Sequence, residues 1–172
     1  MDLTTLIRHW QLEPLPQEGG YYRRIYTHPD SFSSQNHGQR EKQIGSAIYY
    51  LVTADTFSAL HRVRGEELFF FLEGDSCLML QLNEATGTVE EIRLGADTVR
   101  ADIAGKWSRF AAVQSGVWQG LRLCAGGQYA LFGVTVMPGF DWEDFELGAR
   151  NDLIARFPTA AQQVVAFTHS VV

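Results

Sequence analysis

The spacing of short apolar runs is the feature that most constrains this fold. Nine runs rich in Tyr, Phe, Val, Ile and Leu are separated by turn residues, and no helix of useful length fits between residues 44 and 137. Such runs are typical of strands. The predicted strands are 20–27, 46–53, 57–63, 67–72, 77–82, 88–94, 108–113, 117–123 and 128–136. Many short strands without helical crossovers indicate an all-β protein, built as an antiparallel sandwich or barrel.

Helices are predicted only near the two ends of the chain. The first dozen residues are predicted to form a short helix, because Leu3, Leu6, Ile7 and Trp10 recur at helical spacing, and we expect Pro14 and Pro16 to end it. Two further helices are predicted at residues 151–157 and 159–167. We predict one domain over residues 1–172, divided into an N-terminal helix and arm (1–18), a β-barrel (19–140) and a C-terminal helical segment (141–172).

The segment 28–43 interrupts the strand pattern with small and polar residues. It contains Ser31, Ser33, Ser34, Asn36 and Gly38, followed by Arg40, Glu41 and Lys42. This composition predicts a solvated, mobile loop. A long loop in a compact domain is either a lid over a binding site or a tolerated insertion, and the sequence leaves both interpretations open.

The composition excludes several classes of protein. The 172 residues fit one domain, and 14 Lys and Arg against 20 Asp and Glu give a net charge of −6. Nucleic-acid binding requires clustered cations that such a chain lacks, and no apolar run approaches the ~20 residues that span a bilayer. The N-terminus has no signal-peptide pattern, and Cys77 and Cys124 read as buried, reduced thiols. We expect a cytoplasmic protein without nucleic-acid or membrane partners.

His61 and Glu67 are the polar residues that best point to chemistry. His61 lies near the end of one predicted strand and Glu67 begins the next, so a hairpin would bring both side chains to the same interior wall. Alternation puts Phe69 and Phe71 on the face of Glu67. An ionised Glu among phenylalanines is costly unless it is paired, and a paired His and Glu can transfer protons. The alternative for His61 is a hydrogen-bonded structural histidine at a strand end.

The first predicted strand carries an arginine on each face. Tyr22, Arg24 and Tyr26 alternate on one face, and Tyr21, Arg23 and Ile25 share the other. An inward arginine would bind an anion or a carboxylate. Arg23 is our ligand-binding candidate, and an ion pair from Arg23 to Asp144 or Glu146 is the alternative. Adjacent Tyr49 and Tyr50 point in opposite directions, and Tyr50 is the candidate for the cavity.

Residues 55–74 resemble the first motif of the cupin superfamily. That motif reads Gly, five residues, His-x-His, three or four residues, Glu, six residues, Gly. Here His61, Glu67 and Gly74 fit the spacing. Val63 stands at the second His, and Asp55 stands at the leading Gly. The second motif reads Gly, five residues, Pro-x-Gly, two residues, His, three residues, Asn, and its positions are held here by Ser108, Gln114, Gly116, Gln119 and Leu123.

A narrower resemblance covers about residues 12–157. Several segments occur in the order found in small single-domain cupins that are grouped as proteins of unknown function. They are Glu18-Gly19-Gly20-Tyr21-Tyr22-Arg23, Ser46–Leu51, His61-Arg62-Val63, Gly116-Val117-Trp118-Gln119, Tyr129–Gly133 with Pro138-Gly139-Phe140, and Asp144-Phe145-Glu146-Leu147. The resemblance implies a double-stranded β-helix, or jelly roll, usually as a homodimer. It also implies distant kinship with sugar-nucleotide 3,5-epimerases and seed storage globulins.

The resemblance also bears on metal binding. A typical cupin metal site uses three His and one Glu or Asp, and the corresponding positions here are His61, Val63, Glu67 and Gln119. Valine cannot coordinate a metal, and the amide oxygen of Gln119 is a poor donor for late first-row metals. Two strong ligands fall short of the three that hold a catalytic zinc. We predict no cofactor, and a weakly held divalent metal on His61, Glu67 and Gln119 is the alternative.

The second motif also supplies a further wall of the expected cavity. By analogy with that motif, Gln119 lies one strand from His61, and Trp118 either stacks on a ligand ring or fills the core. Arg62 lies at the cavity mouth or belongs to a solvated surface pair. The complete set of ligand-binding candidates is Arg23, Tyr50, Arg62, Phe69, Phe71, Trp118 and Gln119.

Two functions from different classes fit these residues. In the first, the protein binds a small molecule as a metal-independent isomerase or epimerase of a sugar-like or carbonyl substrate. His61 is then the base, Glu67 orients it or acts as the acid, and an arginine stabilises negative charge. The sequence shows no obvious second catalytic acid, which weighs against this function. In the second, the same aromatic cavity holds a small ligand in a non-catalytic binding protein.

Overall fold

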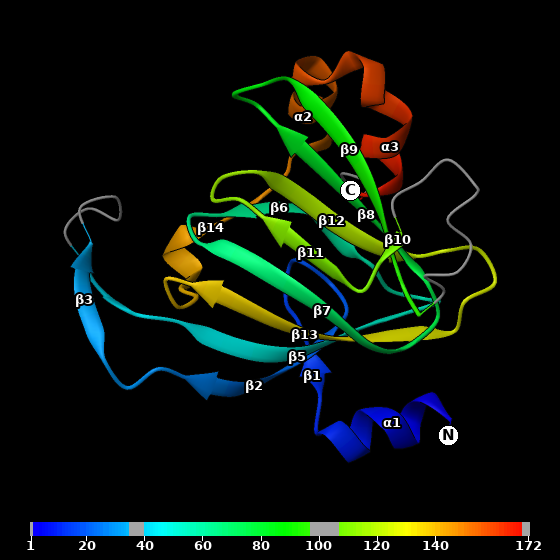
Figure 1. Cartoon of the computed structure of the whole chain (residues 1–172). Coiled ribbons are helices and arrows are strands. Elements are labelled where there is room, and N and C mark those ends of the chain that lie inside the picture. The colour runs from blue at the N-terminus through cyan, green and yellow to red at the C-terminus, as the bar shows by residue number, and fades with distance from the viewer. Residues whose placement is uncertain (1, 35–39, 97–106, 170–172) are drawn as a thin grey trace.

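Two six-stranded sheets face each other in the computed structural model, which describes residues 2–34, 40–96 and 107–169 (Figure 1). The first sheet has the order β1 (Glu13–Pro14), β2 (Tyr21–Thr27), β5 (Ser46–Thr53), β13 (Tyr129–Met137), β7 (Glu66–Gly74) and β11 (Phe110–Val113). The second sheet has the order β10 (Trp107–Ser108), β9 (Thr88–Leu94), β8 (Cys77–Asn83), β12 (Trp118–Leu123), β6 (Ser58–Val63) and β14 (Phe145–Leu147). Neighbouring strands are antiparallel except β10 and β9.

This arrangement confirms the predicted jelly roll. Each of the nine predicted strands is present within a few residues of its expected bounds. The chain crosses between the sheets from β5 to β6, from β6 to β7 and from β7 to β8, and distant strands pair within a sheet, as β5 and β13 do over eight residue pairs. The sequence pattern did not indicate β14, which pairs with β6, because its acidic and aromatic residues read as a connection to the C-terminal helices.

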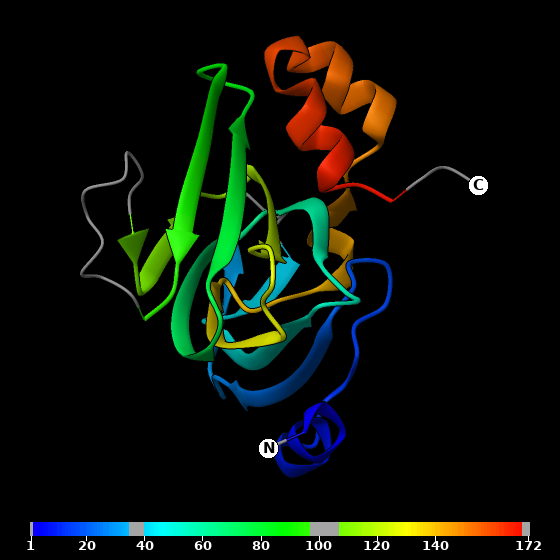
Figure 2. The ribbon, with the colours of Figure 1, turned by 90° about the vertical axis from the view of Figure 1, so that its right-hand side faces the viewer.

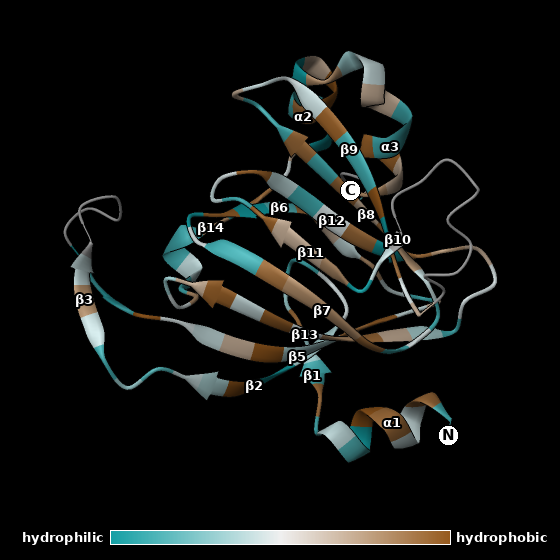
Figure 3. Ribbon diagram, viewed as in Figure 1, coloured by the Kyte–Doolittle hydropathy of each residue, from teal (hydrophilic) through white to brown (hydrophobic). Residues whose placement is uncertain are grey.

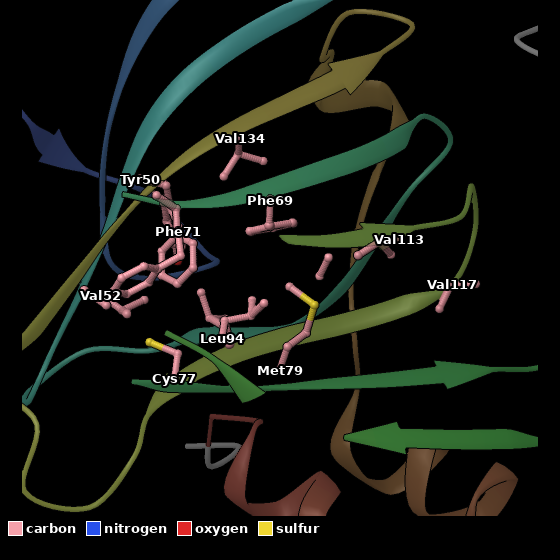
Figure 4. Close-up of a cluster of buried hydrophobic side chains, with 14 residues drawn as sticks. Tyr50, Val52, Phe69, Phe71, Cys77, Met79, Leu94, Val113, Val117 and Val134 are labelled. Atoms are coloured by element: carbon pink, nitrogen blue, oxygen red, sulfur yellow. The ribbon is translucent and has the colours of Figure 1, made fainter. Parts of the chain in front are cut away.

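The space between the sheets is filled by one face of each strand. Brown and teal bands alternate along the strands in Figure 3, as expected when one face is buried and the other is covered separately or solvated. Figure 4 shows Phe69 and Phe71 on β7 and Met79 on β8 pointing into this space, together with Leu94. All four side chains are buried, so period-two alternation explains the core directly.

The N-terminal helix covers the outer face of the first sheet (Figure 1). Helix α1 (Leu3–Trp10) begins at Asp2, whose carboxylate accepts a hydrogen bond from the Thr5 backbone nitrogen at 3.0 Å. Leu6 packs against strand residues Leu51 and Leu131. The helix ends at a left-handed Gln11, so the predicted stop at Pro14 comes three residues late.

The C-terminal helices cover the outer face of the second sheet (Figure 2). They are α2 (Arg150–Arg156), the 3-10 helix η3 (Pro158–Ala160) and α3 (Ala161–Ala166). Leu153 and Phe167 pack there against Leu60 and Trp118. Within the described ranges, no helix is long and apolar enough to cross a membrane.

The segment predicted to be a solvated loop forms a hairpin instead. Its strands are β3 (Ser31–Ser34) and β4 (Arg40–Gln43), and residues 35–39 of the predicted loop lie outside the described residues. Lys42 on β4 is 4% exposed, and its Nζ lies 2.6 Å from an Asp144 oxygen and 2.8 Å from an Asp141 oxygen. Arg40 also contacts Asp144. These cations are the partners of Asp144, a role that the sequence analysis offered as the alternative for Arg23.

Removal of the Lys42 charge tests whether the ion pairs from Lys42 to Asp141 and Asp144 anchor β4 to the segment before β14. The substitution Lys42→Met keeps the aliphatic stem but leaves buried Asp144 without its nearest cation, so we expect unfolding free energy to fall by about 3 kcal/mol in urea denaturation. Glu143→Gln is the control, because Glu143 is 68% exposed and pairs with Arg40 at the surface. Exposed pairs contribute less than about 1 kcal/mol. Equal losses in both variants would contradict the proposed role of Lys42.

Candidate functional site

A cavity lies between the sheets, with a buried polar inner end and a more exposed mouth. The inner end is lined by Glu18, Tyr50, His61 and Glu67. The cavity measures about 70 Å³. On the same measure one water needs about 10–15 Å³, which leaves room for roughly five to seven non-hydrogen atoms. This volume suits a small organic molecule.

His61 on β6 points into this cavity and is 2% exposed. Its Nδ1 lies 2.7 Å from the carbonyl oxygen of Ala59. Because a carbonyl oxygen can only accept, Nδ1 carries a proton and the neutral ring keeps its lone pair on Nε2. The ring stacks on Phe145 of β14 at 5.2 Å between centroids and 25° between planes. The orientation and tautomer of His61 are therefore fixed from two sides.

Gln119 on β12 bridges His61 and Glu67. Its register partner on β6 is His61, and the Nε2 of Gln119 lies 2.8 Å from His61 Nε2 and 3.2 Å from Glu67 Oε2. An amide nitrogen has two N–H donors, so it can serve both acceptors at once. The Oε1 atom of Gln119 is buried and has no hydrogen-bond partner in the described part of the chain.

Glu67 reaches this bridge from the facing sheet. The sequence analysis placed His61 and Glu67 on one wall of a hairpin, but β6 and β7 belong to different sheets, so the turn between them crosses from one sheet to the other. Burial raises the pKa of Glu67 to about 7, with nearby His61 and the Gln119 hydrogen bond opposing the shift. The carboxyl group thus titrates near neutral pH.

Glu18 supplies a second carboxylate, which the sequence analysis did not find. Its Oε2 lies 3.7 Å from His61 Nε2, and its Oε1 accepts a hydrogen bond from Ser58 Oγ at 2.7 Å. The following Gly19 has a φ of +102°, and a Cβ there would lie 2.4 Å from the Phe57 carbonyl oxygen. Only glycine allows the chain to pass so close to β6. An acid directly before paired glycines was the signal in the sequence.

Tyr50 lines the cavity as predicted by sequence, and its hydroxyl donates to the carbonyl oxygen of Gly19 at 2.9 Å. Burial raises the pKa of Tyr50 well above its ordinary value, with Glu18 adding to the shift. The hydroxyl therefore stays protonated and helps to hold the Glu18 segment. Tyr49 faces the other way and makes an edge contact with Trp10 at 4.6 Å.

Three predicted ligand-binding residues, Arg62, Trp118 and Arg23, point away from the space between the sheets. Arg62 lies over the Trp118 ring at 4.4 Å on the outer side of the second sheet and pairs with Glu146 at 2.7 Å. Arg23 donates to the carbonyl oxygen of Trp10 at 3.4 Å. Each of the three directly precedes or follows a residue that points inward. Adjacent residues of a strand face opposite ways, so these three point outward. The two remaining predictions differ from each other, since Phe69 lines the cavity while Phe71 packs against Phe132 in the core.

The mouth contains residues that the sequence analysis did not select. Arg24 and Tyr22 line it from β2, and Phe140 and Trp142 line it from the segment before β14. The rings of Phe140 and Trp142 lie 5.1 Å apart, and Trp142 is 45% exposed. Alternation along β2 offered both arginines, and the structure selects Arg24 as the inward one.

The site and fold can now be compared with known proteins. A family model described as Cupin_5, cupin superfamily (DUF985), matches residues 4–148. Protein SO0799 from Shewanella oneidensis is 26% identical with a TM-score of 0.83, and the match covers 99% of both chains. A hypothetical protein from Leishmania major is 22% identical with a TM-score of 0.85, covering 99% of this chain and 100% of that one. No curated protein matches the chain.

A larger solved protein shares the fold and raises the question of a metal. Oxalate decarboxylase from Bacillus subtilis is 13% identical with a TM-score of 0.52, over 91% of this chain and 37% of that chain, and it has Mn(II) centres. Across residues 2–34, 40–96 and 107–169, no three His, Cys, Asp or Glu side chains form a group that would hold a metal ion. Val63 replaces one donor, and the Gln119 amide nitrogen lies against His61 Nε2. The residues present therefore do not fit a three-His metal site.

The raised pKa of Glu67 makes a prediction about stability. Folding raises this pKa from 4.5 to about 7, so the folded protein holds the proton more tightly than the unfolded chain. The wild type therefore loses stability as the pH rises from 4.5 through 7. Glu67→Gln has no proton to lose at this position, so it should not lose stability in this way. We expect the unfolding free energy of Glu67→Gln minus that of the wild type to rise by about 3 kcal/mol between pH 4.5 and 8.

Urea denaturation at several pH values measures this difference. Glu66→Gln is the matched control, because Glu66 is exposed on the same strand and lies outside the cavity. Glu66→Gln leaves the buried Glu67 carboxyl group in place, so the gain expected for Glu67→Gln should not appear. A flat profile for Glu67→Gln would show that the Glu67 carboxyl group titrates in the folded protein as it does in water.

Proposed function

Because the chain belongs to the Cupin_5 (DUF985) family of the cupin superfamily, we propose that it binds a small molecule in the barrel and transfers protons on it without a metal. The reaction class is isomerisation or epimerisation of a carbonyl or sugar-like substrate. The observation that carries this proposal is a buried imidazole between two carboxylates at the inner end of the cavity. Glu18 provides the second acid that the sequence analysis lacked.

His61 acts as the general base through Nε2. The bond from Nδ1 to the Ala59 carbonyl keeps the lone pair on Nε2, and the Glu18 carboxylate at 3.7 Å stabilises the imidazolium that forms. Glu67, with a pKa of about 7, keeps a large protonated fraction at neutral pH. Two carboxyl groups in different environments thus take different roles, Glu67 as the acid and Glu18 as the fixed negative charge.

The proton balance closes on the substrate. His61 takes the proton from the carbon next to a carbonyl group, and protonated Glu67 gives its proton to the carbonyl oxygen, which forms an enol. If the first carbon carries a hydroxyl group, the enol is an enediol: His61 returns its proton to the former carbonyl carbon, Glu67 takes the proton of the other hydroxyl, and the carbonyl group has moved to give an isomer. If the enol turns over against His61, the same proton returns to the opposite face of the first carbon and gives an epimer, while Glu67 recovers its proton from the enol hydroxyl. In both cases His61 ends neutral and Glu67 ends protonated.

Gln119 is the positioning residue in this scheme. Before the transfer His61 is neutral and Glu67 is protonated, and the amide nitrogen donates to His61 Nε2 at 2.8 Å and to the Glu67 oxygen without a proton at 3.2 Å. After the transfer His61 Nε2 carries a proton, and a turn of the amide lets Oε1 accept from it while the amide nitrogen still donates to the Glu67 carboxylate. The amide oxygen that is buried without a partner in the described structure is the atom that this rotation uses.

The alternative is a non-catalytic binding protein. The walls between mouth and inner end are apolar, and they include Leu15, Ile48, Phe69, Val134 and Val136. Such a cavity binds a small apolar or ring-bearing ligand, with His61 and Glu67 setting its orientation.

Hydrogen exchange at carbon separates the two functions. We expect the wild type to catalyse deuterium incorporation from D₂O next to the carbonyl of short oxo acids or short ketoses, observed by ¹H NMR. His61→Asn should lower the exchange rate at least ~100-fold, because a positioned general base contributes that much, while ligand binding persists. His9→Asn is the control, because the His9 side chain is exposed on α1 and lies outside the cavity.

Each outcome of this experiment decides between the functions. Equal exchange by the wild type and His61→Asn would show that His61 is not the base. Binding of panel members without any exchange by the wild type would favour the non-catalytic function.

A further inference from the structure

The geometry points to Arg24 as the residue that selects the ligand, and to a short oxo or hydroxy carboxylate as the ligand class. This inference rests on the proposed function in that it concerns the same cavity. Arg24 lines the cavity mouth from β2. Among the described residues no carboxylate forms an ion pair with Arg24, whereas the other arginine of the strand, Arg23, is held by the Trp10 carbonyl.

The strand register fixes where the Arg24 charge lies relative to the reacting end. Tyr22 on β2 pairs with Tyr50 on β5, and Arg24 pairs with Ile48, two residues farther along both strands. The Tyr50 hydroxyl donates to the carbonyl oxygen of Gly19, which follows Glu18 in the chain. Tyr50 therefore lies beside the inner polar end of the cavity. Two residues along a strand span ~6.7 Å, which sets the separation between the guanidinium level and the Glu18 and His61 level.

The signs of the charges orient an anion in this cavity. Glu18 and Glu67 both lie at the inner end, and a carboxylate there is repelled by Glu18 and by the ionised fraction of Glu67. The guanidinium at the mouth offers five donors in a planar fork that matches a carboxylate. An organic acid therefore binds with its carboxylate outward on Arg24 and its other end inward against His61.

The space between the two ends limits the length of the acid. Ile48 and Phe69 form apolar walls on the way from the mouth to the inner end, which suits a chain of methylene groups. A carbonyl or hydroxyl group three or four carbons from the carboxylate spans the ~6.7 Å step. Such an acid has about seven or eight non-hydrogen atoms, and the roughly five to seven inside the cavity leave its carboxylate at the mouth. The class is thus a 4- or 5-oxo acid, or the matching hydroxy acid.

Binding of an acid and its neutral amide tests this selection. The probes are 4-oxopentanoate and 4-oxopentanamide, titrated by calorimetry or NMR into the wild type, Arg24→Gln and Arg23→Gln. Loss of a charged hydrogen-bonding partner corresponds to a roughly 10- to 100-fold weaker Kd. We expect that loss for the acid with Arg24→Gln only, partial recovery with Arg24→Lys, and no effect of Arg24→Gln on the amide.

The outcomes distinguish this inference from the proposed function. Equal affinity of the wild type for acid and amide, or an Arg23→Gln effect as large as that of Arg24→Gln, overturns the role of Arg24. No binding of the acid at millimolar concentration also overturns it. Arg24-dependent binding of the acid without deuterium exchange upholds the inference while the catalytic proposal fails. Deuterium exchange on neutral ketones, together with equal affinity of the wild type for the acid and the amide, upholds the catalytic proposal while the inference fails.

Discussion

The structure depends on satisfying a small polar group of side chains inside an otherwise apolar barrel. His61, Glu67 and Gln119 are each less than 10% exposed, and one amide nitrogen serves the imidazole and the carboxylate together. A buried polar network of this kind is stabilising only when nearly all of its members are paired. It also joins the two sheets, because Glu67 belongs to the first and the other two residues to the second. The candidate chemistry and the sheet packing therefore share the same few atoms.

Period-two alternation predicted most of the fold, but it could not tell which face of a strand looks inward. The nine strands and the terminal helices followed from apolar spacing and turn residues, whereas the jelly roll followed from the cupin resemblance. Arg23, Arg62 and Trp118 were chosen as site residues and lie outside the cavity. Alternation fixes the two faces only relative to each other, so an adjacent residue is chosen as easily as the correct one.

The remaining parts of the site come from contacts between distant segments. Glu18 lies 43 residues before His61 in the chain, and it reaches the imidazole because glycines let its loop pass against β6. Lys42 is buried because Asp141 and Asp144 receive it, about a hundred positions away. No local pattern encodes such meetings, although the cupin resemblance did bring His61, Glu67 and Gln119 to attention.

The anchor on Lys42 has a consequence for the entrance of the cavity. Asp141 and Asp144 flank Trp142, so the ion pairs that hold β4 also hold this part of the rim. Dissolved ions screen buried pairs much less than exposed ones. The width of the entrance is thus insulated from changes in ionic strength, while the exposed guanidinium of Arg24 is not. Salt would then change the affinity of the barrel for anions without altering its aperture.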